Sequence, residues 1–340
     1  MRKKKVLFIG GSVNQTSMMY QISQYLNDCE CWFSPYYGDG YIDFLAGKGY
    51  LDFSILGGEF KRRTEEYLKN NHLKIDYKGT RNNYDLVFTG SDLIVPKNIR
   101  NKKVILVQEG MTDPENFLTF LVRNFNLPRW LASTSTTGMS NQYDLFCVAS
   151  EGYKDLFSKK GARSNRILVT GIPNFDNAKQ YLANNFSHKN FVLVATSDAR
   201  ETFKYENRKK FIKECVKIAK GRQLIFKLHP NENVERAVKE INKYAPGALA
   251  FHNSNINHMI ANCDVLITKY SSVVYIGMAL GKEVHSAFKL EELQELTPIQ
   301  NNGTSAERIA SAAAHLMESP NVTVEELQEE ISVKHVIYSR

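Results

Sequence analysis

Two strand–turn–helix units in the second half of the chain constrain the fold most strongly. An apolar run at 224–228 is followed by a His-Pro pair, and a second run at 265–268 is followed by the sequence KYSS. Short apolar runs without polar alternation are typical of parallel strands, which are buried on both faces of a sheet. Each turn would therefore lie at the carboxyl edge of a sheet, where open α/β sheets bind ligands.

The side chains at these two turns suit a phosphate or diphosphate. His229 can donate a hydrogen bond to a phosphate oxygen, and Ser271 and Ser272 offer hydroxyl groups beside the amides of a helix start. Purely structural roles are the alternative: a turn histidine bonded to a carbonyl, and serines that only cap a helix. We predict that the site also includes three neighbouring residues: Lys227, Pro230 and Tyr270.

Further βα units divide the chain into two comparable series. Apolar runs that end in turns lie at 6–9, 84–92, 102–113, 143–152 and 166–177, and the pattern restarts at 188–198. This repetition predicts an α/β protein with two Rossmann-like, doubly wound parallel-sheet domains that face each other across a cleft. We expect the domains to span residues 1–180, on the acceptor side, and 181–340, which would bind the nucleotide.

The first domain supplies its own candidate site residues at strand ends. Gly11 and Ser12 follow the first strand, and glycine lets a backbone approach a ligand closely. Glu109 follows a later strand and precedes Gly110, a position that would direct its carboxylate to the cleft as a general base. The alternative is a glutamate that caps the next helix. The same loop contains two rival bases: Asp113 and Glu115.

Two segments of the first domain have an unusual composition. Residues 29–60 are rich in aromatic residues and glycine, which predicts a long surface loop or a wall on the acceptor side. Residues 117–130, FLTFLVRNFNLPRW, are both apolar and basic. We favour a core helix for this second segment over an element that lies on a membrane surface.

Composition excludes several classes of protein. The chain of 340 residues has 43% hydrophobic and 24% charged residues, as a soluble globular protein does, and lacks the run of about 18 apolar residues that a membrane span requires. Five scattered cysteines suit a reducing cytoplasm. The net charge of +8 either aids solubility or attracts anionic ligands, and peripheral association with the inner face of the membrane stays open. No nucleic-acid motif, metal-ligand spacing or cofactor motif is present.

The combined motifs resemble the glycosyltransferase-B superfamily. The sequence QEG at 108–110, the His-Pro pair and the Ser-Ser pair are similar to the three motifs of bacterial CMP-sugar (sialyl and Kdo) transferases, with Gln108 in place of the first acid. This resemblance implies that Glu109 is the general base. It also implies that the other two motifs hold the phosphate of CMP.

Two further branches of the superfamily share segments with this chain. TGIPNFD at 170–176 and DVLITKYSS at 264–272 resemble CDP-glycerol glycerophosphotransferases, although Lys269 stands where that family usually has Asp and Glu109 stands near its histidine. KLHPNENVERAV, QEG and NNGTSAERI resemble UDP-N-acetylglucosamine 2-epimerases. The histidine-containing motif of those epimerases is replaced here by ATSDARE at 195–201.

Together these features predict a metal-independent transferase without a cofactor. The donor would be a nucleotide-sugar or CDP-alditol, cytidine-linked in the first instance, and the acceptor a glycan or lipid-linked glycan of bacterial surface polysaccharide biosynthesis. An epimerase-like isomerase or hydrolase is the alternative, and a non-catalytic binding protein is a third class. The predicted catalytic residues are Glu109 and His229; the predicted nucleotide-binding or phosphate-binding residues are Gly11, Ser12, Gly110, Lys227, Pro230, Tyr270, Ser271 and Ser272.

Overall fold

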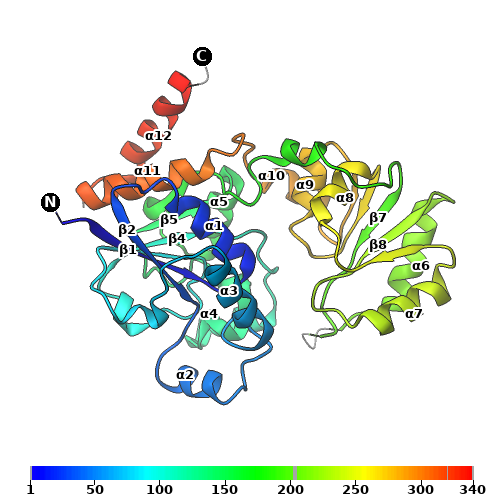
Figure 1. Ribbon diagram of the computed structural model, residues 1–340, viewed down its shortest axis with the longest axis horizontal. Coiled ribbons are helices and arrows are strands. Elements are labelled where there is room, and N and C mark those ends of the chain that lie inside the picture. The colour runs from blue at the N-terminus through cyan, green and yellow to red at the C-terminus, as the bar shows by residue number, and fades with distance from the viewer. Residues whose placement is uncertain (1, 202–204, 320, 339–340) are drawn as a thin grey trace. The chain divides into compact units, whose positions relative to one another are not determined.

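The chain folds as two compact units, each built on one parallel sheet. The computed structural model describes residues 2–201, 205–319 and 321–338. Unit 1 consists of Met1–Asp176 and Asn301–Arg340, and unit 2 consists of Asn177–Gln300 (Figure 1). The two parallel sheets confirm the predicted α/β fold class.

Unit 1 contains a six-stranded sheet in the order β2-β1-β3-β4-β5-β6, and every pair of neighbours is parallel. Its strands are β1 (Lys4–Gly10), β2 (Cys29–Pro35), β3 (Leu86–Thr89), β4 (Lys103–Val107), β5 (Leu145–Val148) and β6 (Ile167–Val169). Its helices are α1 (Val13–Ser23), α2 (Gly40–Gly47), α3 (Gly58–Asn70), α4 (Phe117–Phe125), α5 (Glu151–Lys160), α11 (Ser305–Glu318) and α12 (Val324–Tyr338).

The apolar runs form strands because both faces of this sheet are covered. Phe8 on β1 stacks between Phe33 on β2 and Phe88 on β3, at ring-centroid distances of 5.2 and 4.7 Å. Helices α1, α11 and α12 pack on this face, and α5 covers the other face, where Phe157 meets Phe146 of β5. The ends of the strands are thereby fixed, and with them the turns that carry the site.

Helices α11 and α12 pack on unit 1, which corrects the predicted domain of 181–340. Helix α11 lies against the sheet of unit 1 (Figure 1). It contributes small and branched residues to the core of this unit, including Ile309 and Leu316. On α12, Leu327 and Ile331 join the same core. Unit 2 therefore ends at Gln300, because the alanine-rich helix buries its apolar side against the first sheet.

The segment at 29–60 is more regular than the predicted long loop. Residues 29–35 form the edge strand β2, which pairs with β1 over seven residues. Residues 40–47 then form α2. The first part of this prediction was wrong because an edge strand needs only one partner and tolerates polar alternation, so its sequence lacks a continuous apolar run.

Unit 2 contains a five-stranded parallel sheet in the order β11-β10-β7-β8-β9. The strands are β7 (Val192–Ala195), β8 (Leu224–Lys227), β9 (Leu249–Phe251), β10 (Val265–Ile267) and β11 (Glu283–His285). The helices are α6 (Arg208–Ala219), α7 (Val234–Tyr244), α8 (Ile256–Asn262), α9 (Val274–Ala279) and α10 (Leu290–Glu295). Because β7 lies between β8 and β10, the two motif-bearing turns leave the carboxyl edge on either side of β7.

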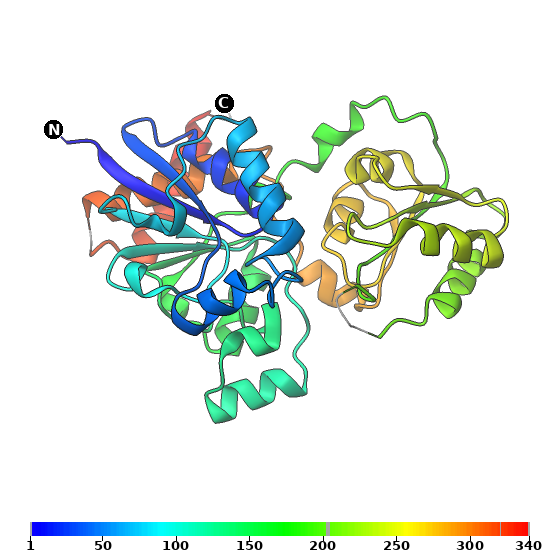
Figure 2. The same ribbon diagram turned by 60° about the horizontal axis from the view of Figure 1, so that its bottom comes forward.

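Helix α4 is not the core helix that the sequence favours. Its aromatic side chains Phe117, Phe120 and Phe125 are 71%, 58% and 67% exposed. Figure 2 shows α4 standing apart from the sheet of unit 1. An Asn116–Thr119 capping box and a left-handed Asn126 at its end define the helix, so its aromatic face is presented to solvent by a well-formed element.

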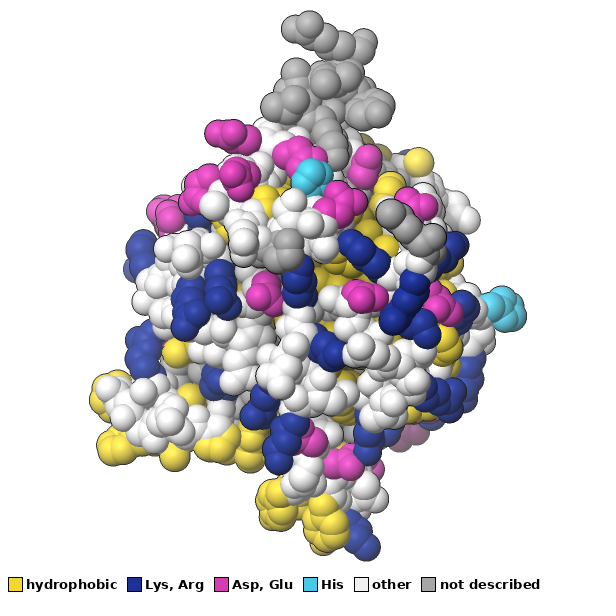
Figure 3. Space-filling view, turned by 90° about the vertical axis from the view of Figure 1, so that its left-hand side faces the viewer, with side chains coloured by type: hydrophobic (Ala, Val, Ile, Leu, Met, Phe, Trp, Pro, Cys, Tyr) yellow, Lys and Arg dark blue, Asp and Glu magenta, His cyan; other side chains and the backbone are white. Residues whose placement is uncertain are grey.

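A second group of exposed aromatic residues lies on and after α2. Tyr41, Phe44, Tyr50 and Phe53 are all more than half exposed. In Figure 3, apolar side chains gather along the lower edge of unit 1, where Figure 1 places α2 and α4, and many Lys and Arg side chains lie above them. No helix in the described part of the chain is long and apolar enough to cross a membrane.

Candidate functional site

The turn after β4 is fixed by a buried glutamine. The backbone N–H of Gln108 donates to the carbonyl of Cys147, and its side-chain oxygen accepts from the N–H of Ala149 at 2.9 Å. Its Nε2 donates to the carbonyl of Gly110 at 2.8 Å. Gln108, which stands in place of an acid, therefore ties β4 to β5 and sets the position of Glu109 between two anchored neighbours.

Glu109 accepts hydrogen bonds from two residues at the start of α1. The Ser12 hydroxyl donates to Oε1 at 2.9 Å, and Nε2 of Gln15 donates to Oε2 at 2.6 Å. Oε1 of Gln15 accepts from the N–H of Gly11 at 2.8 Å, which fixes the orientation of the amide. The structure thus brings together three residues that the sequence singled out for different roles, Gly11, Ser12 and Glu109, within a group that we call the Glu109 cluster.

Gln15 was not predicted, although the sequence contains a signal for it. Ser12 caps α1 by accepting from the N–H of Gln15, and Ser-x-x-Gln is the pattern of a capping box. Here the glutamine side chain serves Gly11 and Glu109 instead of the cap. The capping pattern therefore identifies Gln15 as a residue whose side chain can turn toward Glu109.

The Glu109 cluster contains neutral donors around its carboxylate. Burial raises the pKa of Glu109 above its usual range, and the hydrogen bonds from Gln15 and Ser12 partly oppose this by favouring the charged form. A carboxylate with a raised pKa is a better proton acceptor near neutral pH than an exposed glutamate. The arrangement therefore suits general base catalysis.

A segment before unit 2 completes the cluster. Nδ2 of Asn174 donates to the carbonyl of Glu109 at 3.2 Å, and the carboxylate of Asp176 accepts from the N–H of Ser305 at 2.8 Å. Gly171, in the same segment, has φ +73°, and a Cβ at this position would lie only 2.4 Å from the side chains of Ser305 and Asn301. A larger residue would therefore not fit there. The TGIPNFD segment thus links Glu109 to the first turn of α11.

In unit 2, residues 229–232 form a tight turn after β8, which we call the His229 turn. The Thr196 hydroxyl accepts from the N–H of His229 at 3.1 Å and donates to Glu232 at 2.5 Å. Nδ1 of His229 accepts from the N–H of Asn231 at 3.3 Å and lies 3.6 Å from Oδ2 of Asp198. Thr196 and Asp198 were not predicted, because isolated polar residues after a strand carry no distinctive pattern.

Two predicted neighbours of His229 have structural contacts. Lys227 is buried, and its ammonium group donates to the carbonyls of Leu228 and His252 at 2.7 and 2.8 Å. Burial also lowers the pKa of Lys227. The prediction that Lys227 neutralises phosphate is corrected accordingly: Lys227 joins the ends of β8 and β9. Pro230 is exposed, and its carbonyl lies 3.3 Å from Nε2 of His252.

Residues 269–272 form the second turn, which we call the Lys269 turn. The carbonyls of Ser271 and Ser272 accept from Val274 and Tyr275, so α9 begins only after the serines. Among the described residues, neither serine hydroxyl has a hydrogen-bond partner. Tyr270 is 60% exposed and packs edge-on against a neighbouring ring at 5.3 Å. The serines are thus half-buried turn residues, not the helix caps of the alternative explanation.

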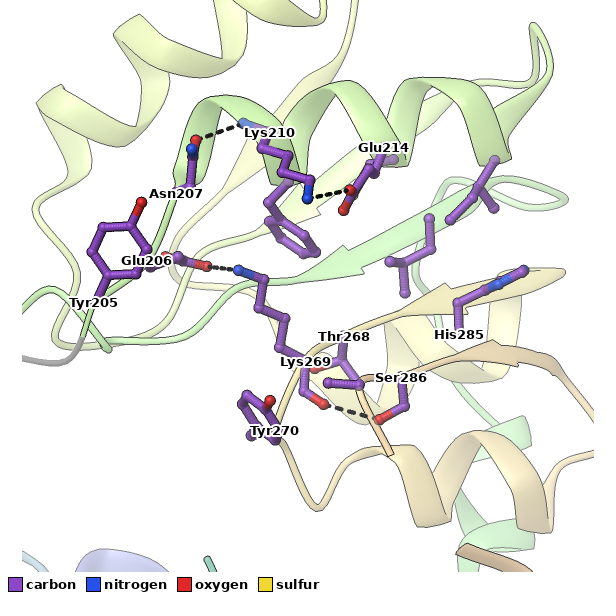
Figure 4. A pocket seen from close by; sticks show the side chains of 15 residues that line it. Tyr205, Glu206, Asn207, Lys210, Glu214, Thr268, Lys269, Tyr270, His285 and Ser286 are labelled. Carbon is purple, nitrogen blue, oxygen red and sulfur yellow. Dashed lines mark hydrogen bonds and ion pairs between the residues drawn. The ribbon is translucent and has the colours of Figure 1, made fainter. Parts of the chain in front are cut away.

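A cavity of about 550 Å³ lies between α6 and the turns after β10 and β11 (Figure 4). Lys269 and Tyr270 line it together with Glu206, whereas His229 and the two serines do not. Its floor is apolar, with Phe211 and Ile267. The cavity therefore adjoins the Lys269 turn but is separate from the turn that carries His229.

The described residues contain no candidate metal-binding site. Among these residues, no group of three or more His, Cys, Asp or Glu side chains is arranged to hold a metal ion. The five cysteines are free, and burial raises the pKa of the thiols of Cys147, Cys215 and Cys263 to about 12.

Comparison with known proteins relates the chain to one family. The model of the family described as CDP-Glycerol:Poly(glycerophosphate) glycerophosphotransferase matches residues 94–282, more than half of the chain. No curated protein sequence matches.

Solved structures resemble the chain in fold. A UDP-N-acetylglucosamine 2-epimerase has 13% identity and a TM-score of 0.54, and the match covers 94% of this chain and 98% of that one. The wall teichoic acid polymerase TagF, in a histidine variant soaked with CDPG, has 13% identity, coverage of 94% and 90%, and a TM-score of 0.50. HepE of Anabaena, in complex with UDP, has 13% identity, coverage of 99% and 100%, and a TM-score of 0.50. The predicted glycosyltransferase-B-like fold is thereby confirmed.

Proposed function

Because the chain belongs to the CDP-Glycerol:Poly(glycerophosphate) glycerophosphotransferase family, we propose that it transfers a glycerophosphate-type group from a CDP-activated donor to a hydroxyl group of a surface polymer. Of the two predicted transferase types, this selects the glycerophosphotransferase. The acceptor oxygen would bond to the distal phosphorus of the donor while the bond to the bridging oxygen breaks. CMP leaves, and the proton of the acceptor passes to a base.

The observation that carries the proposal is the Glu109 carboxylate, held by Ser12 and Gln15 and raised in pKa by burial. We assign Glu109 as the base that takes the acceptor proton. No cation of the described residues pairs with this carboxylate, so it keeps its proton affinity.

Unit 2 would bind the donor through its two turns. His229 would donate to a phosphate oxygen through Nε2, since its Nδ1 faces Asn231 and Asp198. The hydroxyls of Ser271 and Ser272 would contact the diphosphate from the other side of β7. Two strand spacings amount to about 10 Å, which a CDP diphosphate and its ribose can span. We keep the prediction that no metal is needed, so chelation by EDTA should leave turnover unchanged.

Ligand-dependent melting ranks the donors. A ligand that binds only the folded state raises the melting temperature, by an amount that grows with its concentration relative to Kd. We expect CDP and CDP-glycerol to stabilise the protein more than UDP or UDP-N-acetylglucosamine does. Stabilisation by the uridine compounds alone would contradict the cytidine assignment. Conversion of UDP-N-acetylglucosamine without an acceptor would support the epimerase alternative.

We also propose that unit 1 associates with an anionic membrane surface, where a lipid-linked acceptor would lie. The exposed aromatic residues of α4 and α2 form an apolar edge, and Arg123 on α4 and many surrounding basic side chains complement anionic head groups (Figure 3). The positive net charge of the protein also favours attraction to an anionic membrane surface.

Vesicle sedimentation tests this surface. The wild-type protein should sediment with vesicles of phosphatidylglycerol and phosphatidylcholine, and the Phe117→Ser, Phe120→Ser double variant should bind at least about fivefold more weakly because it loses apolar contact area. Tyr205→Ser, which changes a 91% exposed aromatic residue in unit 2, is the matched control. Equal sedimentation of all three proteins would rule out this surface.

A further inference from the structure

Buried charges of alternating sign connect the two turns of unit 2. The side chains of Glu232, Glu206 and Arg208 are 0%, 2% and 4% exposed. Nη2 of Arg208 lies 2.6 Å from Oε1 of Glu232 and 2.9 Å from Oε2 of Glu206. One guanidinium nitrogen thus holds two carboxylates, and it does so through close charge contacts more than through aligned hydrogen bonds.

Each carboxylate reaches one of the turns. Oε1 of Glu206 lies 3.2 Å from Nζ of Lys269, the first residue of the Lys269 turn (Figure 4). The same ammonium group lies 4.7 Å from the centre of the Phe211 ring. Lys269 is therefore held by a charge and by an aromatic face on α6. Its charge is directed away from the turn, toward Glu206 and Phe211 in the wall of the cavity.

At the other end, Glu232 closes the His229 turn. Its Oε2 accepts from the Thr196 hydroxyl at 2.5 Å and lies 3.4 Å from the N–H of His229. Burial raises the pKa of Glu232, and Arg208 opposes this shift most strongly. The orientation of this turn therefore depends on a carboxylate whose charged form depends on Arg208.

No strand pairing joins the two turns directly, because β7 separates β8 from β10. Buried ion pairs also contribute little net stability, since the cost of removing charges from water offsets their attraction. The series of three buried charges, Glu206, Arg208 and Glu232, is thus better explained as a means of fixing the relative position of the two turns than as a source of stability. It holds two loops of a split binding site in a defined relation.

We propose that Arg208 is a positioning residue that sets the distance between the His229 turn and the Lys269 turn, and so determines the affinity of unit 2 for a diphosphate. Lys269, Glu206 and Glu232 act with it. This inference rests on the proposed function, because the two turns are taken as the donor diphosphate site. It explains why a lysine can stand where the family usually has an aspartate: its charge is compensated by Glu206 instead of facing the ligand.

The test is titration calorimetry with CDP and with inorganic diphosphate. In Arg208→Lys the positive charge stays, but the lysine side chain is shorter, so its ammonium group does not reach the position of Nη2, the one atom that contacts both carboxylates. We expect at least a tenfold weaker Kd for both probes and a melting temperature within a few degrees of the wild type. Arg222→Lys is the matched control, because the side-chain partners of Arg222 among the described residues are the carbonyls of Ala219 and Ile218 at the far end of α6.

A second variant keeps the inference testable if Arg208→Lys does not fold. Glu206→Gln preserves the shape of the side chain and removes the buried negative charge that contacts Lys269. It should weaken diphosphate binding by a similar factor and speed amide hydrogen exchange in the distant His229 turn, which a local effect would not do. Unchanged Kd values in a folded variant would overturn the inference alone. A wild-type protein that binds neither probe would overturn the proposed donor site and the inference together.

Discussion

At the scale of single residues, the proposed chemistry depends on how one carboxylate is surrounded. Glu109 has neutral hydrogen-bond donors in Ser12 and Gln15, so burial dominates and its pKa is raised. Catalysis needs the deprotonated form of Glu109, so activity should fall as the pH drops through this raised pKa. The loss should therefore occur at a higher pH than it would with an exposed glutamate as the base.

The amide of Gln15 tunes this pKa in a predictable direction. It stabilises the charged form of Glu109, so Gln15→Met removes a contribution that lowers the pKa. The acid limb of the kcat/KM pH profile should move to higher pH, by about one unit if a charge-assisted hydrogen bond of roughly 1.5 kcal/mol is lost. Gln24→Met, at the exposed end of α1, should leave the profile unchanged. A shift to lower pH would contradict the assignment.

The site residues differ in how far the sequence could identify them. Glu109, Ser12 and Gly11 stand at strand ends in recognisable motifs, and the structure brings them together. Lys227 stands in an equally suggestive place, yet its ammonium group is buried against two carbonyls. The sequence could not distinguish these cases, because a lysine at the end of a strand can point to either side of the sheet.

At the scale of secondary-structure elements, the apolar runs locate the central strands well. Edge elements were harder: β2 lies at the edge of its sheet beside one strand, β1, and α4 buries little of its apolar face. The sequence also could not predict which sheet α11 packs on. An alanine-rich helix fits either sheet, and only the three-dimensional contacts show that it packs on the sheet of unit 1. Long-range packing, more than local propensity, determined what could not be predicted.

The return of α11 and α12 to the first sheet predicts how fragments behave. Large apolar side chains of these helices, such as Ile309, Leu316, Leu327 and Ile331, are buried in the core of unit 1. At about 1.5–3 kcal/mol each, their loss is comparable to a whole domain's stability of about 5–15 kcal/mol. A fragment of residues 1–176 should therefore lack a cooperative thermal transition.

Unit 2 provides the comparison for that fragment. Residues 177–300 have their own core, built from β7, β8, β10 and the helices α6 and α7, and should melt cooperatively alone. Circular dichroism of both fragments and of the full chain measures this. Cooperative melting of 1–176 without residues 301–340 would show that the last two helices are dispensable and that the sequence-based boundary was adequate.

At the scale of the whole molecule, the two units carry separable parts of the proposed reaction. Unit 1 holds Glu109, which we assign as the base, and the apolar edge that we assign to a membrane surface, and unit 2 holds the turns that we assign to the donor. Substitutions in unit 1 should therefore affect turnover or vesicle binding and spare nucleotide affinity. Those in the turns of unit 2 should affect affinity first.

The most direct test compares Glu109→Gln with the wild-type protein in CMP release from CDP-glycerol, with a polyol-phosphate acceptor present. Glutamine keeps the size of the side chain and cannot accept the proton, so we predict a loss of turnover of at least about 100-fold with an unchanged Kd for CDP. Full turnover in Glu109→Gln would contradict the account, because the carboxylate would then not be the base.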